Sequence, residues 1–215
     1  MQLTTMKDFD STLYFITNSS PYTQTEFLDR VEQALLGGAT MIQLREKDRT
    51  TREYIDLAFK VQELARNHNV PLIIDDRVDV ALAVKCEGVH LGQSDMPVKT
   101  ARAILGSGFI IGATTKTVPQ ALEAYGQGAD YCGVGAIYPT TTKVKTVLTS
   151  VQTLSEICRS VPIPVNAIGG LNKDNLSVLK GSGISGICVV SAIMHADNPK
   201  KEAETLLELA KGLVS

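Results

Sequence analysis

The amino-acid sequence predicts an α/β protein in which eight strands close into a (β/α)8 TIM barrel. Eight short apolar runs alternate with amphipathic helical patterns along the chain, and several runs are apolar throughout, as expected for parallel strands buried on both faces. The runs span residues 13–17, 41–45, 72–75, 88–91, 110–114, 131–135, 165–168 and 187–190. Eight units in 215 residues leave roughly 27 residues each, which fits a compact barrel. An open doubly wound sheet would show the same alternation, and the strand count favours the closed form.

Capping residues predict where the helices begin. Thr23 and Glu26 have the spacing of a capping box before a stretch with apolar residues at helical spacing, and Thr50 and Glu53 repeat that pattern. Further helices are expected after Thr117, after Asn172 with an end near Gly181, and at Asn198-Pro199.

Composition indicates one globular domain over residues 1–215, with a loose N-terminal arm over about residues 1–12. The net charge of −2 gives no support for nucleic-acid binding, and we find neither a secretory signal nor an apolar stretch that could span a bilayer. The four cysteines contain no Cys-x-x-Cys pair, which favours free, buried thiols in a reducing compartment. We therefore expect a cytoplasmic protein with small-molecule partners, without nucleic-acid or membrane partners. A homo-oligomer is compatible with the sequence, which does not fix the oligomeric state.

The run after the second strand predicts an anion-binding site. Strand alternation places Gln43, Arg45 and Lys47 on one face, while Leu44 lies on the other and packs outward on helices. Inward-facing cations at the carboxyl end of a barrel strand need a partner or a ligand, and barrel enzymes build active sites there. The alternative is a structural network in which Arg45 pairs with Asp75.

Carboxylates after the next two strands predict a Mg²⁺ site. Asp75 and Asp76 are adjacent at the end of the third strand, and Asp95 lies in the following strand–helix loop. Adjacent like charges need compensation, and Mg²⁺ typically takes one or two carboxylates together with phosphate oxygens. The alternative is that these aspartates cap the following helices. His90, inside the fourth strand, is interpreted as a satisfied core histidine.

Hydroxyl-rich and glycine-rich segments after later strands predict phosphate binding. Thr114 ends the fifth strand, where its hydroxyl would face the barrel mouth. The strand over residues 131–135 leads into Thr140, Thr141, Thr142 and Lys143. Gly170 and Ser191 follow the seventh and eighth strands, the pair of loops that often holds a phosphate in such barrels. The alternatives are a solvated loop around Lys143 and a tight turn at Gly170.

At these residues the sequence resembles the thiamine-phosphate synthase family from about residue 13 to residue 213. The motifs that carry the resemblance occur in the family's order: Gln43-Leu44-Arg45-Glu46-Lys47, Asp75-Asp76-Arg77, Gly88 to Asp95, Pro139 to Lys143, Ala167 to Gly170, and Val190-Ser191. The chain departs from the family at Asp75, where Asn is usual, at Thr114, where Ser is usual, and over residues 144–148.

The resemblance implies a transferase that joins 4-amino-2-methyl-5-(diphosphooxymethyl)pyrimidine to a thiazole phosphate and releases pyrophosphate. It implies that Asp76 and Asp95 hold Mg²⁺ and that Arg45, Lys47, Thr114 and Lys143 act in catalysis. The implied substrate contacts are Gln43, Leu44, Arg45, Glu46, Lys47, Asp75, Thr114, Thr140, Thr141, Thr142, Lys143, Gly170, Val190 and Ser191. The alternatives are a thiazole tautomerase on the same fold and a non-catalytic barrel that binds thiamine intermediates.

Overall fold

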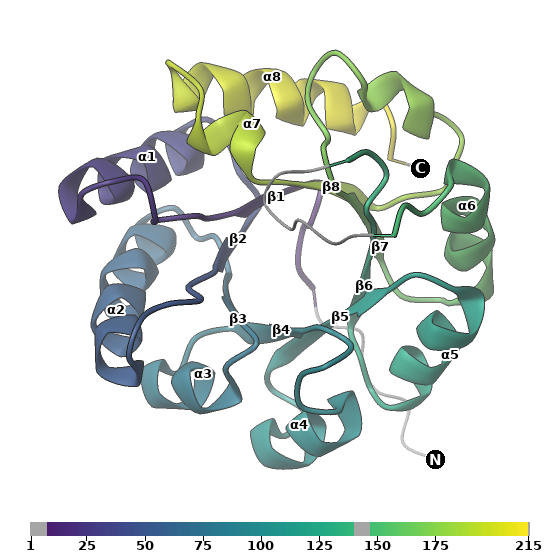
Figure 1. Ribbon diagram of the computed structural model, residues 1–215, viewed down its shortest axis with the longest axis horizontal. Helices are drawn as coiled ribbons and strands as arrows, with labels where there is room; N and C mark the ends of the chain where they lie inside the picture. The colour runs from purple at the N-terminus through teal and green to yellow at the C-terminus, as the bar shows by residue number, and fades with distance from the viewer. Residues whose placement is uncertain (1–7, 140–146, 215) are drawn as a thin grey trace.

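The strands of the computed structural model, which describes residues 8–139 and 147–214, form a closed parallel barrel. Each strand pairs with the next along the chain, and β1 also pairs with β8, which closes the ring (Figure 1). The predicted barrel is therefore confirmed, and the open-sheet alternative is wrong. The strands are β1 (Leu13–Ile16), β2 (Met41–Leu44), β3 (Leu72–Asp75), β4 (Gly88–Leu91), β5 (Ile110–Thr115), β6 (Tyr131–Gly135), β7 (Val165–Ile168) and β8 (Gly186–Val189).

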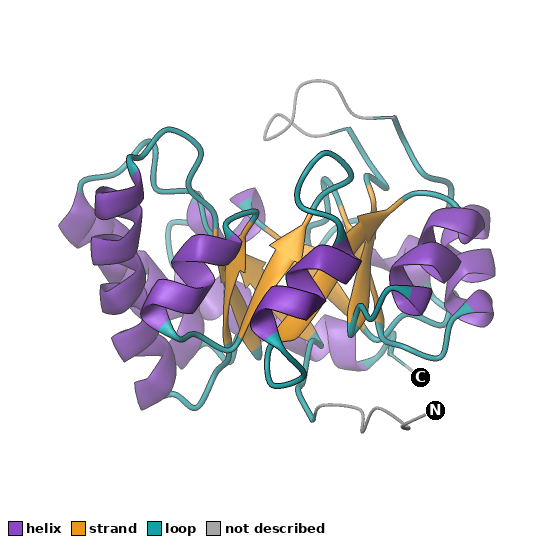
Figure 2. Cartoon of the chain, turned by 90° about the horizontal axis from the view of Figure 1, so that it is seen from below, coloured by secondary structure: helices purple, strands orange, loops and turns teal. Residues whose placement is uncertain are grey.

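Helices surround the barrel and cover the outer faces of its strands (Figures 1 and 2). They are α1 (Gln24–Leu36), α2 (Thr51–Asn67), α3 (Val78–Val84), α4 (Val98–Leu105), α5 (Val118–Gly126), α6 (Val151–Ser160), the 3-10 helix η1 (Leu176–Leu179), α7 (Ser191–Met194) and α8 (Pro199–Lys211). Of the expected N-terminal arm, residues 8–12 contain neither helix nor strand, and residues 1–7 lie outside the described residues. Within the described chain, every helix falls short of the length and hydropathy needed to cross a bilayer.

The predicted capping boxes begin α1 and α2. The Thr50 hydroxyl accepts from the backbone N–H of Glu53, and the Glu53 carboxylate accepts from the backbone N–H of Thr50 at 2.9 Å. Thr23 and Glu26 do the same for α1. These reciprocal bonds satisfy donors that the first turn of a helix leaves unpaired.

The prediction of a helix after Asn172 is wrong. Only the single 3-10 turn η1 forms there. The Asn172 side chain accepts from the backbone N–H of Asp174, and the Asn175 side chain accepts from the backbone N–H of Asn172. Side chains that bond the nearby backbone in this way favour turns over helix. Too few residues then remain before Gly181, whose φ is +75°, for an α-helix to form.

Two separate cores stabilise the barrel. Ile42 and Leu44 belong to the larger core between strands and helices, which confirms the outward face predicted for β2. The smaller core fills the barrel interior and consists of Tyr14, Ile16, Met41, Ile73, Ile110, Tyr131 and Cys188. This interior packing leaves the polar side chains of the strands to gather at the carboxyl ends.

Candidate active site

A cavity of about 570 Å³ opens at the carboxyl ends of the strands. All eight strands contribute to its wall, through Tyr14, Gln43, Asp75, His90, Thr114, Gly133, Ile168 and Cys188 among others. A cavity of this size suits a small organic molecule. Its position is the one at which barrel enzymes assemble catalytic groups.

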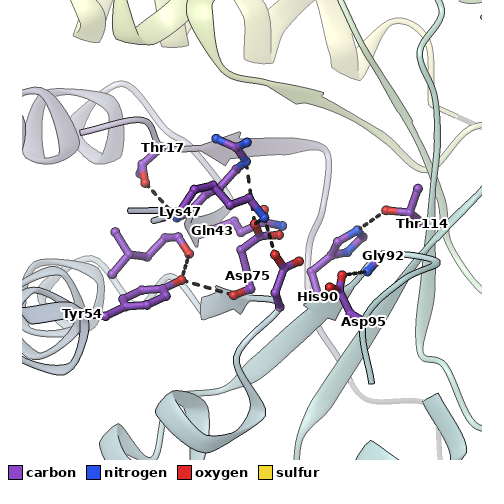
Figure 3. Close-up of polar contacts among 12 residues, drawn as sticks. Thr17, Gln43, Lys47, Tyr54, Asp75, His90, Gly92, Asp95 and Thr114 are labelled. Carbon is purple, nitrogen blue, oxygen red and sulfur yellow. Dashed lines mark hydrogen bonds and ion pairs between the residues drawn. The ribbon is translucent and has the colours of Figure 1, made fainter. Parts of the chain in front are cut away.

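Cations and carboxylates meet at one side of this cavity, after β2 and β3 (Figure 3). Lys47 Nζ lies 2.8 Å from Asp75 Oδ2 and also pairs with Asp76. Arg45 Nε lies 3.7 Å from the same oxygen of Asp75. The alternative pairing of Arg45 with Asp75 is therefore present, and all four side chains also line the cavity.

The protein environment raises the pKa of the Asp75 carboxyl group above its value in water. Burial raises the pKa of Asp75 to about 6, and the Asp76 charge adds to this, while Lys47 and Arg45 oppose it. Burial alone lowers the pKa of Lys47, but the charges of Asp75 and Asp76 outweigh it and raise the pKa. Lys47 therefore remains a cation at neutral pH and holds the two carboxylates together.

Asp76 and Asp95 face one another across the cavity rim. Burial and the Asp76 carboxylate raise the pKa of Asp95. Burial also acts to raise the pKa of Asp76, but hydrogen bonds with Lys47 and Asp95 outweigh it, so the pKa is lowered. Asp95 Oδ2 accepts from the backbone N–H of Gly92 at 2.7 Å, which fixes the loop after β4 (Figure 3).

Neither α3 nor α4 begins with a side-chain cap, so the alternative that these aspartates serve as helix caps is wrong. Among residues 8–139 and 147–214 there is no group of three or more His, Cys, Asp or Glu side chains that could hold a metal ion. An ion at this rim would have two carboxylate ligands and would need further oxygens from water or phosphate, a donor set that suits Mg²⁺.

His90 is hydrogen-bonded at both ring nitrogens, as predicted for a satisfied histidine, but it is half-buried and lines the cavity instead of lying in the core. Its Nδ1 lies 3.0 Å from the Tyr131 hydroxyl. Its Nε2 lies 2.9 Å from Thr114 Oγ1 (Figure 3). Gln93 Nε2 donates to the Thr114 carbonyl at 2.6 Å. The hydroxyl and backbone of Thr114 are thus both fixed at the cavity floor.

Glycines after β7 shape the opposite wall. Gly169 and Gly170 have φ values of +104° and +64°, which favour glycine. A Cβ on Gly170 would lie 2.7 Å from the Pro139 carbonyl oxygen, so only glycine lets these segments approach so closely. Both glycines, together with Val190 and Ser191, line the cavity.

Comparison with known proteins places this site in a family. The family model for thiamine monophosphate synthase matches residues 13–193. The chain belongs to the thiamine monophosphate synthase family. A thiamine-phosphate synthase from Methanobrevibacter smithii is 47% identical over 203 residues, covering 94% of this chain and 97% of that protein. A thiamine phosphate pyrophosphorylase from Pyrococcus furiosus superposes with a TM-score of 0.86 at 40% identity, covering 95% of this chain and 97% of that one. Membership in the thiamine monophosphate synthase family makes the chain a transferase of thiamine biosynthesis.

The structure brings most of the residues expected from this family to one cavity. Those that line it are Gln43, Arg45, Lys47, Asp75, Asp76, Asp95, Thr114, Gly170, Val190 and Ser191. Leu44 packs in the outer core, and Glu46 accepts from Ser19 at 2.7 Å and from Arg49 at 2.8 Å, so neither side chain lines the cavity. Their predicted substrate contacts stay a prediction, as do those of Thr140, Thr141, Thr142 and Lys143, which lie outside the described residues.

Sequence reasoning missed three side chains that line the cavity of this family member and one that lies beneath it. Tyr14, Gln93 and Lys116 line the cavity. Tyr131 lies beneath it, hydrogen-bonded to Tyr14 and His90. Tyr131 shares strand alternation with Gly133 and Gly135, which would have placed it inside the barrel. Lys116 follows β5 directly and donates to the Val147 carbonyl at 2.8 Å, a contact that no local pattern predicts.

Proposed function

We propose that this chain catalyses the condensation of 4-amino-2-methyl-5-(diphosphooxymethyl)pyrimidine with a thiazole phosphate, forming thiamine phosphate and pyrophosphate. The single observation that carries the proposal is the convergence of Arg45, Lys47, Asp76 and Asp95 on one cavity whose opposite wall is built from Gly170 and Ser191. One side thus has groups for a diphosphate and a divalent cation. The other side has glycines and a hydroxyl that suit a phosphate ester.

The donor set fits Mg²⁺ at Asp76 and Asp95. The two carboxylates lie close enough to share a hydrogen bond, so they repel one another when both are ionised. A divalent cation held by Asp76 and Asp95 would relieve that repulsion. When bound there, Mg²⁺ supplies charge neutralisation for the oxygens of a leaving diphosphate.

The chain's own residues perform the remaining work in this mechanism. Arg45 and Lys47 bind the diphosphate and stabilise the negative charge that develops as the carbon–oxygen bond to the pyrimidine methylene breaks. Thr114 offers its hydroxyl at the cavity floor. Gly170 and Ser191 hold the thiazole phosphate so that the thiazole nitrogen faces the methylene carbon and forms the new bond, which is catalysis by positioning. No side-chain nucleophile is required, and none is assigned.

The test is an assay of pyrophosphate and thiamine phosphate from the two substrates, with Mg²⁺ and with chelator. We expect both products in equal amounts, only when Mg²⁺ and both substrates are present. Thiazole isomerisation without pyrophosphate would contradict the proposal and support a tautomerase. Equal rates with and without Mg²⁺ would contradict the assignment of Asp76 and Asp95.

A substitution of Arg45 tests the proposal that this cation stabilises the leaving diphosphate. Arg45→Ala is expected to lower kcat at least ~100-fold, the loss typical of one preorganised group that stabilises charge in the transition state. Arg52→Ala is the matched control, because Arg52 is exposed on α2 and does not line the cavity. Near wild-type turnover in Arg45→Ala would refute this role.

A further inference from the structure

Five hydrogen-bonded side chains cross the barrel beneath the cavity, and we call them the interior relay. Gln43 Nε2 donates to the Tyr14 hydroxyl at 2.7 Å, and that hydroxyl lies 2.8 Å from the hydroxyl of Tyr131. The Tyr131 hydroxyl lies 3.0 Å from His90 Nδ1, and His90 Nε2 lies 2.9 Å from Thr114 Oγ1. The two tyrosines are buried, with at most 1% of their surface exposed.

One direction of donation connects all the bonds of the interior relay. Gln43 Nε2 can only donate, so the Tyr14 oxygen accepts from it. Either hydroxyl can be the donor between Tyr14 and Tyr131; in the direction that we infer, Tyr14 donates to Tyr131, and Tyr131 donates to His90 Nδ1. Burial raises the pKa of both tyrosines well above the ordinary value, so both keep these protons.

This direction fixes the chemistry at the other end. In this direction His90 accepts at Nδ1 and carries its proton on Nε2, from which it donates to Thr114 Oγ1. The Thr114 proton is then left for a ligand. With Gln43 Nε2 donating to Tyr14, Gln43 Oε1 is the acceptor of that side chain.

Two glycines make room for the rings of the interior relay. A Cβ on Gly112 would lie 2.0 Å from Cζ of Tyr131, and a Cβ on Gly133 would lie 3.2 Å from Cε1 of His90. The tyrosine ring therefore fills the space that a side chain on β5 would need. The absence of side chains at Gly112 and Gly133 therefore allows the observed positions of the Tyr131 and His90 rings.

We propose that Tyr131 is a positioning residue that holds His90 in the Nε2–H tautomer and thereby makes Thr114 a hydrogen-bond donor toward the substrate. The inference rests on the proposed function, in which the pyrimidine diphosphate occupies this cavity. A coupled acceptor at Gln43 and donor at Thr114 suits an aminopyrimidine, which carries an N–H donor beside a ring-nitrogen acceptor.

The direct test is ¹⁵N NMR of the histidine side chains in the full-length protein, which has only three histidines. In the wild type we expect His90 Nδ1 to resonate as an unprotonated nitrogen and Nε2 as a protonated one. In Tyr131→Phe both should move to intermediate values, because nothing then favours one tautomer. Tyr125→Phe is the matched control: Tyr125 is an exposed tyrosine on α5 that does not line the cavity, so the wild-type tautomer persists.

Kinetics separates positioning from a merely structural role. Tyr131→Phe should lower kcat about tenfold, in line with the loss of one partner of a buried hydrogen bond. Since the effect acts through the Thr114 hydroxyl, the double variant Tyr131→Phe/Thr114→Val should be no slower than Thr114→Val alone. Additive losses in this cycle would overturn the proposal.

The remaining outcomes also decide the proposal. A protonated Nδ1 in the wild type, or an unchanged tautomer in Tyr131→Phe, would overturn it. Should Tyr131→Phe not fold, the wild-type spectrum alone decides, since Nε2–H supports the relay direction and Nδ1–H or a doubly protonated ring contradicts it. If the wild type released no pyrophosphate, the proposed function would fail, whereas the spectra would still report on the relay.

Discussion

Asp75 places a negative charge between the two cations that we assign to the diphosphate. Its carboxylate lies 2.8 Å from Lys47 Nζ and 3.7 Å from Arg45 Nε. An incoming diphosphate must compete with Asp75 for both groups. On this assignment Asp75 weakens diphosphate binding and holds the side chains of Arg45 and Lys47 close together.

Asp75→Asn should therefore lower the KM for the pyrimidine diphosphate about tenfold, equivalent to about 1.4 kcal/mol of binding. Removing the charge frees Lys47 and Arg45 for the substrate. Steady-state kinetics at saturating thiazole phosphate measures the effect. Asp79→Asn is the control, because Asp79 pairs with Arg77 outside the cavity and should leave KM unchanged. An increase in KM for Asp75→Asn would contradict this account.

At the scale of single residues, sequence reasoning found charged groups better than it found the groups that position them. Arg45, Lys47 and Asp76 were predictable because charges directly after apolar strands are unusual and need a partner. Tyr14 and Tyr131 were not, because a tyrosine in a strand is ordinary and its hydroxyl partner lies on a distant strand. Glu46 shows the opposite case: its position in a motif indicated a ligand contact, yet its side chain bonds Ser19 and Arg49.

At the scale of elements, one arginine connects the segments that precede β5 and β6. Arg102 on α4 donates to the carbonyls of Gly106, Phe109 and Gly128, and pairs with Asp130 at 2.6 Å. Asp130 in turn accepts from the backbone N–H of Ile111 at 2.7 Å. These contacts lie at the barrel face opposite the cavity, where residues serve stability and not catalysis.

Arg102→Met should accordingly lower the free energy of unfolding by about 2–4 kcal/mol, because it removes the cation paired with Asp130 and a donor to three backbone carbonyls. The kcat of the folded variant should stay close to wild type. Urea unfolding and steady-state assays measure the two effects. Arg159→Met, on the exposed side of α6, is the matched control and should change neither. A large loss of kcat without a loss of stability would show that this face is not purely structural.

Helix starts were the elements that the sequence predicted best, and the segment after β7 was predicted worst. Thr23, Thr50 and Asn198 each satisfy backbone donors of the first turn from a local position, so the signal lies in adjacent residues. Asn172 offers the same residue type, but its side chain bonds within a turn. The competition between cap and turn depends on the chain that follows, which a cap pattern does not contain.

At the scale of the whole molecule, closure of the barrel decides which side chains meet. Alternating strands and helices fit both open and closed sheets, and only the pairing of β1 with β8 brings the ends of all strands to one cavity. The strand count supported closure but did not establish it. The interior relay could not be predicted, because each of its hydrogen bonds joins residues far apart in sequence.

The buried thiols make the whole fold sensitive to alkaline pH. Burial raises the pKa of Cys86 to about 12 and those of Cys132 and Cys158 to about 11, from an ordinary value of 9.0. A group with a raised folded-state pKa gives stability that is complete below the unfolded pKa and is lost as pH rises toward the folded value. The free energy of unfolding should therefore fall between pH 9 and pH 11.

Urea unfolding under reducing conditions across that range measures this loss. Cys132→Ala should flatten the pH dependence, because it removes one of the titrating groups. Stability that stays constant or rises between pH 9 and pH 11 would contradict the burial assigned to these thiols.

The central claim is that one rim of the barrel holds a diphosphate through two cations and a metal ion on Asp76 and Asp95. The most direct measurement is calorimetric titration of inorganic pyrophosphate into the protein, with Mg²⁺ and with chelator. Asp76→Asn provides the variant, because asparagine tolerates the φ of +61° at this position. We predict binding that requires Mg²⁺ and weakens at least ~10-fold in Asp76→Asn, equivalent to about 1.4 kcal/mol. Equal pyrophosphate affinity with and without Mg²⁺, and in wild type and variant, would contradict the claim.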